Sequence, residues 1–265
     1  MTPLTKIGQL YFKREDLNPT GSAKDRALPV QIENLLQQKY STAVISSTGN
    51  AAISASYYCH QANIPLTVFV SPHINPKKLS LIKAHVIKSP RPISDSIKFS
   101  KSHKSYLLRQ STDPHAQTGY GQIATELLIQ LPEITSLIIP VGSGTTLLGV
   151  AKKLPKNVKI FAAQSAANPT ISSHFDSEYL PEEINITDSL TVKYLPLKKE
   201  IIAQIKQHHG SAATLSSLQI NEQLNIVKQL KASIETALSL AAIEKLKSTQ
   251  DLGDFPVILV TGTKR

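Results

Sequence analysis

The chain has 265 residues, of which 41% are hydrophobic, and its formal net charge at pH 7 is +10. This length supports a large core in one or two domains, and no apolar run approaches the ~20 residues of a membrane span. The cationic side chains are spread along the chain and aromatic residues make up only 5%, which offers little for base stacking. We therefore expect neither a nucleic acid nor a membrane as partner.

The single cysteine, Cys59, rules out an intramolecular disulfide framework and indicates a reducing compartment, so we expect a cytoplasmic protein. The first 16 residues contain no apolar run of the kind that marks a signal peptide. A metal site is not expected either, because no Cys-x-x-Cys or His-x-x-x-His spacing occurs. His208 and His209 are adjacent and would not share a helix face.

The first predicted helix begins within the stretch NPTGSAKDRA, Asn18 to Ala27. Ser22 followed three positions later by Asp25 predicts a capping box. Lys24 then falls in the first helical turn, where the helix dipole disfavours a cation. Either Lys24 is a solvated lysine beside Asp25, or its site favours the neutral amine that Schiff-base chemistry requires. Lys24 alone does not decide between these interpretations.

Short β-rich runs alternate with helical segments between residues 42 and 109. The pattern predicts four strands, at 42–47, 66–71, 85–89 and 105–109. It predicts three helices between them, at 50–62, 75–84 and 93–102. This alternation is typical of a parallel sheet with helices on its faces.

The alternation restarts beyond residue 120, with helices predicted at 121–131 and 145–154 and strands at 136–141 and 158–165. Residues 165–200 are rich in proline and polar side chains and are predicted to be irregular. Apolar residues at helical spacing predict a helix over 220–247, and 255–260 is a final, fully buried strand. We therefore predict an α/β fold of two lobes, each a mostly parallel, twisted sheet flanked by helices.

Three of the predicted strands end in loops that are suited to bind a ligand, since ligands of open α/β sheets lie beyond the carboxyl ends of strands. SSTGN (Ser46 to Asn50) and GSGTT (Gly142 to Thr146) each follow a strand and open a helix, so they offer hydroxyls and backbone amides to an anion. Thr261 stands at the exit of the last strand. GYGQIA (Gly119 to Ala124) matches a loose dinucleotide pattern but follows no strand, so we assign it no cofactor.

Four stretches together resemble the fold-type-II pyridoxal-phosphate enzymes, the family of threonine synthase, threonine and serine dehydratases, and cysteine synthase. They are KREDLNPTGSAKDRA, SSTGNAAISAS, IIPVGSGTTLLGV and VTGTKR. The resemblance spans nearly the whole chain, and LNPTGSAKDR and PVGSGTTLLG look most like threonine synthase. It implies pyridoxal 5'-phosphate as cofactor, a small amino-acid substrate and a homodimer. It also implies a large cofactor-binding lobe of residues 1–40 and 119–265, and a small mobile lobe of residues 41–118 that carries the SSTGN loop.

The resemblance assigns a role to each motif. It makes Lys24 the catalytic residue, which forms the Schiff base with the cofactor aldehyde and, once freed, acts as the general base at the substrate Cα. Asn50 is implied to hydrogen-bond the cofactor's ring hydroxyl oxygen, and Thr261 to face its pyridine nitrogen. Because Thr261 is neutral, we expect elimination or replacement in preference to transamination. The cofactor phosphate is assigned to the loop residues Gly142, Ser143, Gly144, Thr145 and Thr146.

The substrate is assigned to two short runs by the same resemblance. Its carboxylate is expected at SSTGN, on Ser47, Thr48, Gly49 and Asn50. Arg109 and Ser111, in the run RQST, are the further substrate-binding residues that we expect.

The sequence departs from the family after RQST. Phosphohomoserine enzymes of the family commonly carry Asn-Pro-x-Arg there, with the arginine near the substrate phosphate. This chain has DPHA, which places Asp113 and Ala116 at those positions, although Arg109 lies close in sequence. Ser143 stands where the phosphate-loop region often carries an asparagine. The chain is also short for the family, so we expect no separate effector-binding domain.

We therefore expect a carbon–oxygen lyase that resembles threonine synthase, which converts O-phosphohomoserine and water to threonine and phosphate. The departures keep two enzymatic alternatives open, a serine or threonine ammonia-lyase and a cysteine-synthase-like β-replacement enzyme. A catalytically silent scaffold of the same fold is the alternative from outside enzymology, and it is disfavoured because every key position is occupied.

Overall fold

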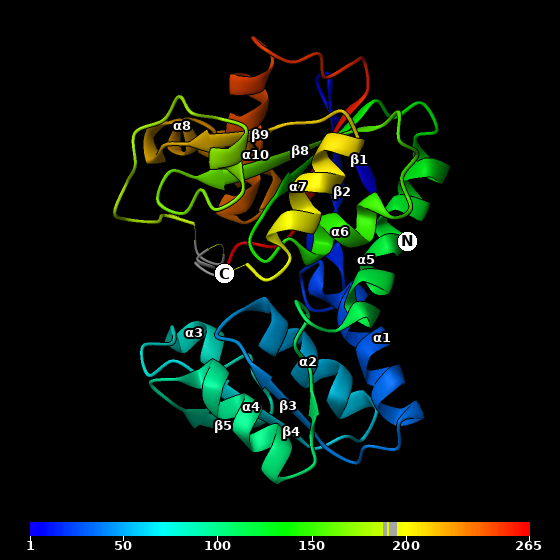
Figure 1. Ribbon diagram of the computed structural model, residues 1–265, viewed down its shortest axis with the longest axis vertical. Coiled ribbons are helices and arrows are strands. Elements are labelled where there is room, and N and C mark those ends of the chain that lie inside the picture. The colour runs from blue at the N-terminus through cyan, green and yellow to red at the C-terminus, as the bar shows by residue number, and fades with distance from the viewer. Residues whose placement is uncertain (188–189, 191–194) are drawn as a thin grey trace. The chain divides into compact units, whose positions relative to one another are not determined.

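The computed structural model of the protein describes residues 1–187, 190 and 195–265 (Figure 1). The chain divides into two compact units, the first made of Met1–Asn18 and Tyr120–Lys264, the second of Pro19–Gly119 and Arg265. Each unit contains a largely parallel sheet flanked by helices, so the predicted fold class is confirmed. Residues 19–40 belong to the second unit by this division, and the roles of the two lobes stay predictions.

The second unit contains a four-stranded sheet in the order β5-β4-β3-β6, with every neighbouring pair parallel. Its strands are β3 (Ala43–Ser46), β4 (Leu66–Val70), β5 (His85–Lys88) and β6 (Tyr106–Leu107). Its helices are α1 (Lys24–Gln37), α2 (Asn50–Gln61), α3 (Pro76–Leu79) and α4 (Pro92–Ser102). The predicted alternation over 42–109 is therefore confirmed, because each parallel connection needs a crossover and a helix supplies it.

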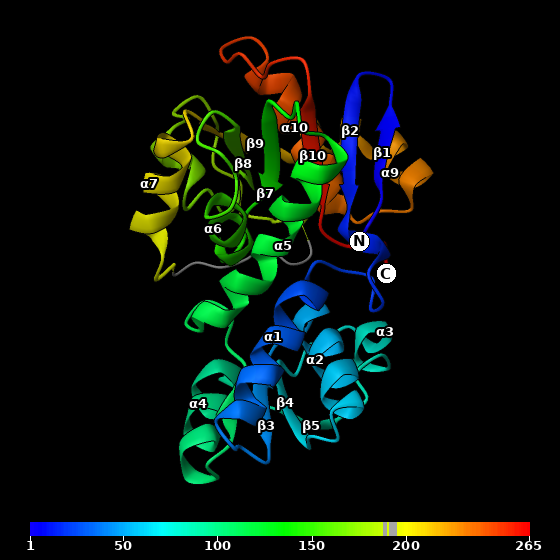
Figure 2. The same ribbon diagram turned by 90° about the vertical axis from the view of Figure 1, so that its right-hand side faces the viewer.

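The first unit contains a six-stranded sheet in the order β1-β2-β10-β7-β8-β9, whose strands are labelled side by side in Figure 2. The strands are β1 (Leu4–Ile7), β2 (Leu10–Arg14), β7 (Ser136–Pro140), β8 (Lys159–Ser165), β9 (Ala212–Leu215) and β10 (Pro256–Val260). Among the strands that the structure describes in this sheet, β1 and β2 alone pair antiparallel, joined by a turn in which Gly8 has φ +60. Strands β1, β2 and β9 are only four or five residues long and were not predicted from the sequence.

The helices of the rest of the chain are α5 (Pro114–Gln130), α6 (Thr145–Ala151), α7 (Lys198–Gln207), α8 (Ser217–Glu222), α9 (Leu224–Leu230) and α10 (Ile234–Leu246), with 3-10 turns η1 (Glu15–Leu17) and η2 (Ser172–His174). They differ from the prediction at the start of α5, at α7, which was not predicted, and over 220–247. The single helix expected over 220–247 is wrong: Lys231, with φ +53, ends α9 in the left-handed region, and α10 starts anew. Helix α5 starts seven residues earlier than expected.

The segment 165–200 was expected to be irregular throughout. Residues 188–189 and 191–194 of this segment lie outside the described residues. Its described part contains η2 and the start of α7 in addition to irregular chain.

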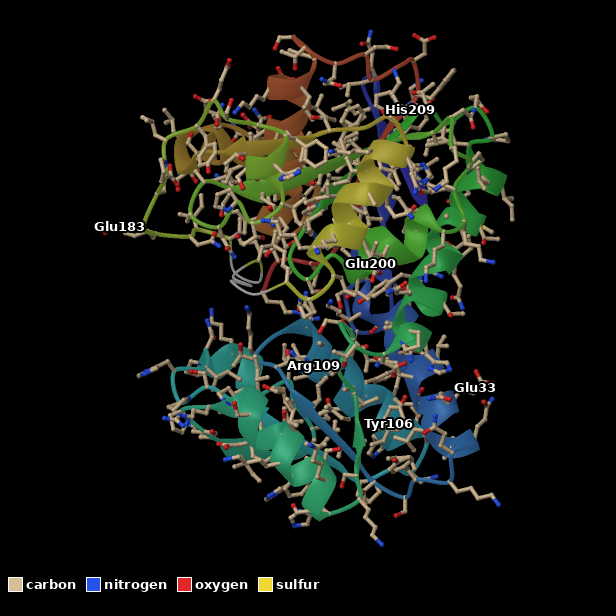
Figure 3. The ribbon with its side chains drawn as sticks, viewed as in Figure 1. Glu33, Tyr106, Arg109, Glu183, Glu200 and His209 are labelled. Atoms are coloured by element: carbon tan, nitrogen blue, oxygen red, sulfur yellow. The ribbon has the colours of Figure 1, made fainter. Side chains whose placement is uncertain are left out.

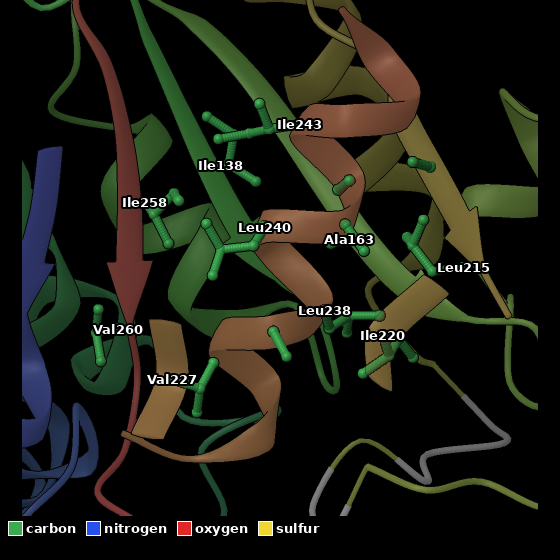
Figure 4. Close-up of a cluster of buried hydrophobic side chains, with 14 of the residues drawn as sticks. Ile138, Ala163, Leu215, Ile220, Val227, Leu238, Leu240, Ile243, Ile258 and Val260 are labelled. Carbon is green, nitrogen blue, oxygen red and sulfur yellow. The ribbon is translucent and has the colours of Figure 1, made fainter. Parts of the chain in front are cut away.

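Helix α10 packs across the sheet of the first unit and forms the centre of its core (Figure 4). Leu240 and Ile243 of α10 belong to one buried cluster with Ile138 of β7 and Ile258 of β10. Burial of each such side chain contributes about 1.5–3 kcal/mol. The cluster therefore fixes β7 and β10, the two strands that lead into the GSGTT loop and Thr261.

No helix in the described ranges is both long and apolar enough to cross a membrane.

Candidate active site

Lys24 is the first residue of α1, but the start of this helix differs from the prediction. The N-cap position is Ala23, and no side chain caps the helix. The predicted capping box is wrong, since Ser22 uses only its backbone carbonyl, which accepts from the amide of Asp25. The Ser22 hydroxyl is buried and has no hydrogen-bond partner.

Asp25 fixes the backbone around Lys24 through contacts on both sides of the turn. Its carboxylate accepts hydrogen bonds from the amide and hydroxyl of Thr20, at 2.6 and 2.5 Å, and from the hydroxyl of Ser54 on α2 at 2.6 Å. Asp25 is only 5% exposed. The turn that presents Lys24 is thus attached to the helix that follows the SSTGN loop.

The amine of Lys24 has a polar partner that the sequence analysis missed. Lys24 Nζ donates a hydrogen bond to Oε1 of Gln110 at 2.8 Å. The two residues are 86 positions apart, and no spacing rule joins them. Their contact follows from the topology, since Gln110 belongs to the loop that leaves β6.

The SSTGN loop leaves the carboxyl end of β3 and opens α2 at Asn50, as predicted. The Ser47 hydroxyl accepts from the amide of Gly49 at 3.2 Å, and Thr48 is exposed. Nothing lies within 4 Å of the place that a Cβ on Gly49 would occupy. The loop therefore leaves open space beside its backbone, where a small carboxylate could be bound.

The run RQST lies at the same edge of the second unit's sheet as SSTGN, because β3 and β6 are parallel neighbours. Figure 3 labels Tyr106 and Arg109 on this segment. Arg109 and Ser111 are partly buried on either side of Gln110. The carbonyl of Arg109 accepts from the amides of Thr112 and Asp113, both at 3.0 Å, which closes the segment into a turn.

Asp113 anchors this turn to two helices and a strand. Its Oδ2 accepts from Gln31 of α1 at 2.8 Å and from the Tyr106 hydroxyl at 2.7 Å, and its Oδ1 accepts from the amide and ring of His115, both at 2.9 Å. Burial acts to raise the pKa of Asp113, but the bonds from Gln31, Tyr106 and His115 outweigh it, so this pKa is lowered. Burial and the bond to Asp113 raise the pKa of Tyr106 to about 12, so Tyr106 remains a donor.

We expect Asp113→Asn to lower the free energy of unfolding at pH 7 by about 1–3 kcal/mol, because the amide cannot accept all four bonds. The pKa of Asp113 is lower in the folded chain than the ~3.9 of an unfolded aspartate. Its stabilisation is therefore present above pH ~3.9 and is lost as the pH falls through the folded value. Urea unfolding at pH 7, 5, 4 and 3 checks this, with exposed Asp254→Asn as control. Equal acid sensitivity of wild type and Asp113→Asn contradicts the prediction.

The GSGTT loop of the first unit follows β7 and opens α6 at Thr145. Gly144 has φ +76, and a Cβ there would lie 2.0 Å from Cδ1 of Ile201 on α7. Glycine therefore allows the close approach of loop and helix. The hydroxyls of Ser143 and Thr145 lie 3.1 Å apart, and the first turn of α6 supplies backbone amides without intrahelical partners. Hydroxyls and amides in such a turn have the chemistry that a phosphate monoester requires.

Thr261 follows β10 and lies at the same edge of this sheet as the GSGTT loop. Strands β10 and β7 are parallel neighbours, with Ile258 opposite Ile138, so their carboxyl ends coincide. Thr261 is partly buried. The predicted site residues thus form two groups: Lys24, Ser47–Asn50, Arg109 and Ser111 in the second unit, and Gly142–Thr146 and Thr261 in the first.

The chain matches a known family over almost its full length. The family model described as "Pyridoxal-phosphate dependent enzyme" matches residues 1–262. The chain belongs to this family, its fold is that of fold type II, and its cofactor is pyridoxal 5'-phosphate. The residues present fit this cofactor, since GSGTT has the donors for a phosphate and Lys24 offers a primary amine.

Curated relatives and solved structures agree with this assignment. The chain is 23% identical over 279 residues to L-threonine ammonia-lyase of Geobacter sulfurreducens, which covers 97% of this chain and 68% of the relative. It is 25% identical to threonine synthase of Methanosarcina acetivorans, over 97% of this chain and 70% of the relative. The match to the solved structure of maize serine racemase covers 100% of this chain and 88% of the racemase chain, with a TM-score of 0.89 and 20% sequence identity.

No group of His, Cys, Asp and Glu side chains suited to hold a metal ion occurs in residues 1–187, 190 and 195–265. His208 is buried, and its Nδ1 and Nε2 lie 2.9 and 3.1 Å from the carbonyl oxygens of Val158 and Ala151. Burial lowers the pKa of His208. His208 is therefore a buried histidine whose ring nitrogens contact backbone carbonyls.

Proposed function

We propose that this chain is an ammonia-lyase that eliminates water from a hydroxy amino acid, serine or threonine, and releases a keto acid and ammonia. The observation that carries the proposal is Ala116, at the position where phosphohomoserine enzymes commonly carry an arginine. Ala116 is 0% exposed within α5. Asp113, at the asparagine position, is a carboxylate whose oxygens are bonded to Gln31, Tyr106 and His115. A buried alanine and an anion give a substrate phosphate no support.

The named relatives support the same substrate class. The threonine ammonia-lyase relative is named for the reaction proposed here, and it aligns with 97% of this chain. The loss of a β-hydroxyl needs no cation for a phosphate leaving group, so the substitution at Ala116 is compatible with it.

In this proposal each residue group performs one task. Asn50, GSGTT and Thr261 hold the cofactor, which when bound supplies the electron sink for a carbanion at the substrate Cα. The Ser47 and Thr48 hydroxyls and the amides at Gly49 and Asn50 bind the substrate carboxylate. The neutral amine of Lys24 takes the Cα proton on Nζ and so becomes an ammonium.

Threonine synthase chemistry on O-phosphohomoserine is the second candidate, and Arg109 is the observation that favours it. Arg109 precedes Gln110, the residue that contacts Lys24, and it is partly buried. In the part of the chain that the structure describes, no carboxylate pairs with its guanidinium. A cation in that state could bind a substrate phosphate in place of the missing arginine.

The test offers serine, threonine, O-phosphohomoserine and, with sulfide, O-acetylserine side by side, and it follows keto acid, threonine, D-serine, free phosphate and sulfide consumption. The proposal expects keto acid from serine or threonine and no phosphate from phosphohomoserine. Threonine and phosphate from phosphohomoserine would move the assignment to the second candidate. Sulfide consumption with O-acetylserine would identify a β-replacement enzyme. Formation of D-serine without keto acid would identify a racemase, and the absence of any turnover would identify a silent scaffold.

Arg109→Ala separates the two candidates further. If a phosphate ester is the substrate, loss of one charged hydrogen bond of about 1.5–3 kcal/mol weakens its binding by roughly 10- to 150-fold. Under the ammonia-lyase proposal, kcat/KM for serine or threonine changes by less than about threefold, as for a surface substitution. The exposed Arg91→Ala of the same unit serves as the matched charge control.

A further inference from the structure

Gln110 is a nearly buried side chain, 9% exposed, and it contacts Lys24. The proposed function assigns no role to this contact. We propose that Gln110 is a positioning residue for Lys24: its amide oxygen orients Nζ and stabilises the ammonium that forms when Lys24 takes up the Cα proton. This inference rests on the proposed role of Lys24. An amide oxygen can only accept a hydrogen bond, whereas a lysine amine can donate in both protonation states.

The contact is held in place by a row of polar side chains along α1. Lys24, Gln31 and Asn34 are seven and three positions apart, so they share one face of the helix. Gln31 donates to Asp113 at 2.8 Å and Asn34 donates to the Tyr106 hydroxyl at 2.7 Å. Lys24 donates to Gln110 at the N-terminal end of the same row. Helix α1 is thus attached at three points to β6 and the turn that follows it.

The turn that carries Gln110 is itself fixed at both ends. On one side the amide of Leu108 donates to the carbonyl of Val44 on β3 at 2.9 Å. On the other side Asp113, which also bonds His115 of α5, closes the turn on the Arg109 carbonyl. With both ends fixed, the Gln110 amide needs little further ordering to meet Lys24.

The charged groups beside Lys24 in the first turn of α1 are Asp25 and the cation Arg26. On α1, Asp25 is bonded to Thr20 and Ser54, and Arg265 donates to the Thr20 carbonyl. On the turn and α5, Asp113 is bonded as described, beside His115 and the cation Arg109. In the first two turns of α2, Asn50 to Tyr57, the one titratable side chain is the phenol of Tyr57. The neutral oxygen of Gln110 is therefore well placed to influence the charge state of Lys24.

Gln110 acts on the step in which a proton is transferred from the substrate to Lys24. The proton leaves the substrate Cα for Nζ, and the C–H electron pair stays with the substrate. A hydrogen bond from an ammonium is stronger than one from a neutral amine. The Gln110 oxygen therefore favours the protonated product of this step, and a change in its charge should move the protonation of Lys24 in a defined direction.

The test follows the reaction of Lys24 with acetic anhydride between pH 7 and 11, in the full chain freed of cofactor with hydroxylamine. Peptide mass spectrometry gives the Lys24 rate relative to exposed Lys101 in the same sample. Gln110→Leu removes the acceptor, so the midpoint of the pH profile falls and Lys24 reacts about fivefold faster at neutral pH. Gln110→Glu adds a carboxylate, so the midpoint rises. The control Gln37→Leu, at an exposed position of α1, leaves the profile unchanged.

Opposite shifts in the two Gln110 variants are the result that supports positioning by charge. Unchanged midpoints, or shifts in the same direction, would overturn it, and unfolding curves of each variant report any general loss of structure. In the holoenzyme, Gln110→Leu is expected to lower kcat more than it raises KM. The labelling is independent of turnover, so failure of the ammonia-lyase proposal in the substrate panel is distinguishable from failure of this inference.

Discussion

Lys24→Ala is expected to abolish turnover, with a loss of at least about 10³-fold, because it removes both the covalent attachment of the cofactor and the proposed base at Cα. The fold should survive, since Lys24 lies at the first position of α1 and alanine is a strong helix former. The rate of product formation and the far-UV circular dichroism spectrum measure the two effects. Lys24→Arg, which retains a cation but cannot form the covalent attachment, is expected to be equally inactive.

Borohydride reduction followed by peptide mapping identifies the cofactor lysine directly. The pyridoxyl group is expected on the peptide that contains Lys24 and nowhere else. Lys77→Ala, at an exposed position of α3, is the matched control and should keep both label and turnover. A label on another lysine of the wild-type chain would refute the assignment, whatever the activity of the variants.

Gly144→Val should weaken cofactor binding by roughly 10- to 150-fold, the effect of losing one hydrogen bond to a charged phosphate. At φ +76 a side chain costs about 1–2 kcal/mol, and the clash with Ile201 adds about 1–3 kcal/mol. Two measurements check this, the titration of the apoprotein with cofactor and the urea midpoint of unfolding.

Two further variants separate the backbone strain from the clash. Gly8 also has a positive φ, of +60, but no atom lies within 4 Å of an added Cβ, so Gly8→Ala reports the strain alone. Ile201→Ala shortens the side chain that clashes with an added Cβ at position 144. The double variant Gly144→Ala/Ile201→Ala should therefore be about 0.5–3 kcal/mol more stable than the sum of the two single changes predicts. Unaltered cofactor affinity in Gly144→Val would mean that the phosphate is bound elsewhere.

The regular α/β alternation was the most predictable part of this protein. Strands such as Ala43–Ser46 and Pro256–Val260 consist mostly of apolar residues, and they appear where the pattern places them. The predicted helix over 220–247 failed because apolar spacing continues through Lys231, whereas the backbone there is left-handed. Periodicity reports which side chains are buried, and a turn between two helices on the same core does not interrupt it.

The start of α5 was missed for a related reason. The helix was predicted to start at Gly121, yet Gly119 also lies within it. A Cβ on Gly119 would lie 2.1 Å from the carbonyl oxygen of Arg26, so glycine allows α5 to approach α1 closely. A glycine that serves helix packing cannot be distinguished from a loop glycine in a single sequence.

The motif loops could be placed at strand ends from the sequence, because strand order within a parallel sheet brings their carboxyl ends together. The contact between Lys24 and Gln110 could not be predicted from the sequence. Gln110 belongs to no motif, and its contact depends on the pairing of β6 with β3 and on the Asp113 carboxylate that holds the turn. Contacts that arise from long-range topology carry no local signal.

The order of strands in the first unit has a consequence for how the chain is synthesised. Strand β2 pairs with β10, so one neighbour of β2 is translated only after the whole of Pro19–Gly119 has been made. The sheet of Pro19–Gly119 lies within one continuous stretch and can close long before that. During translation β2 can pair with β1, but its other edge stays open, and this edge must be kept from associating with other chains until β10 emerges.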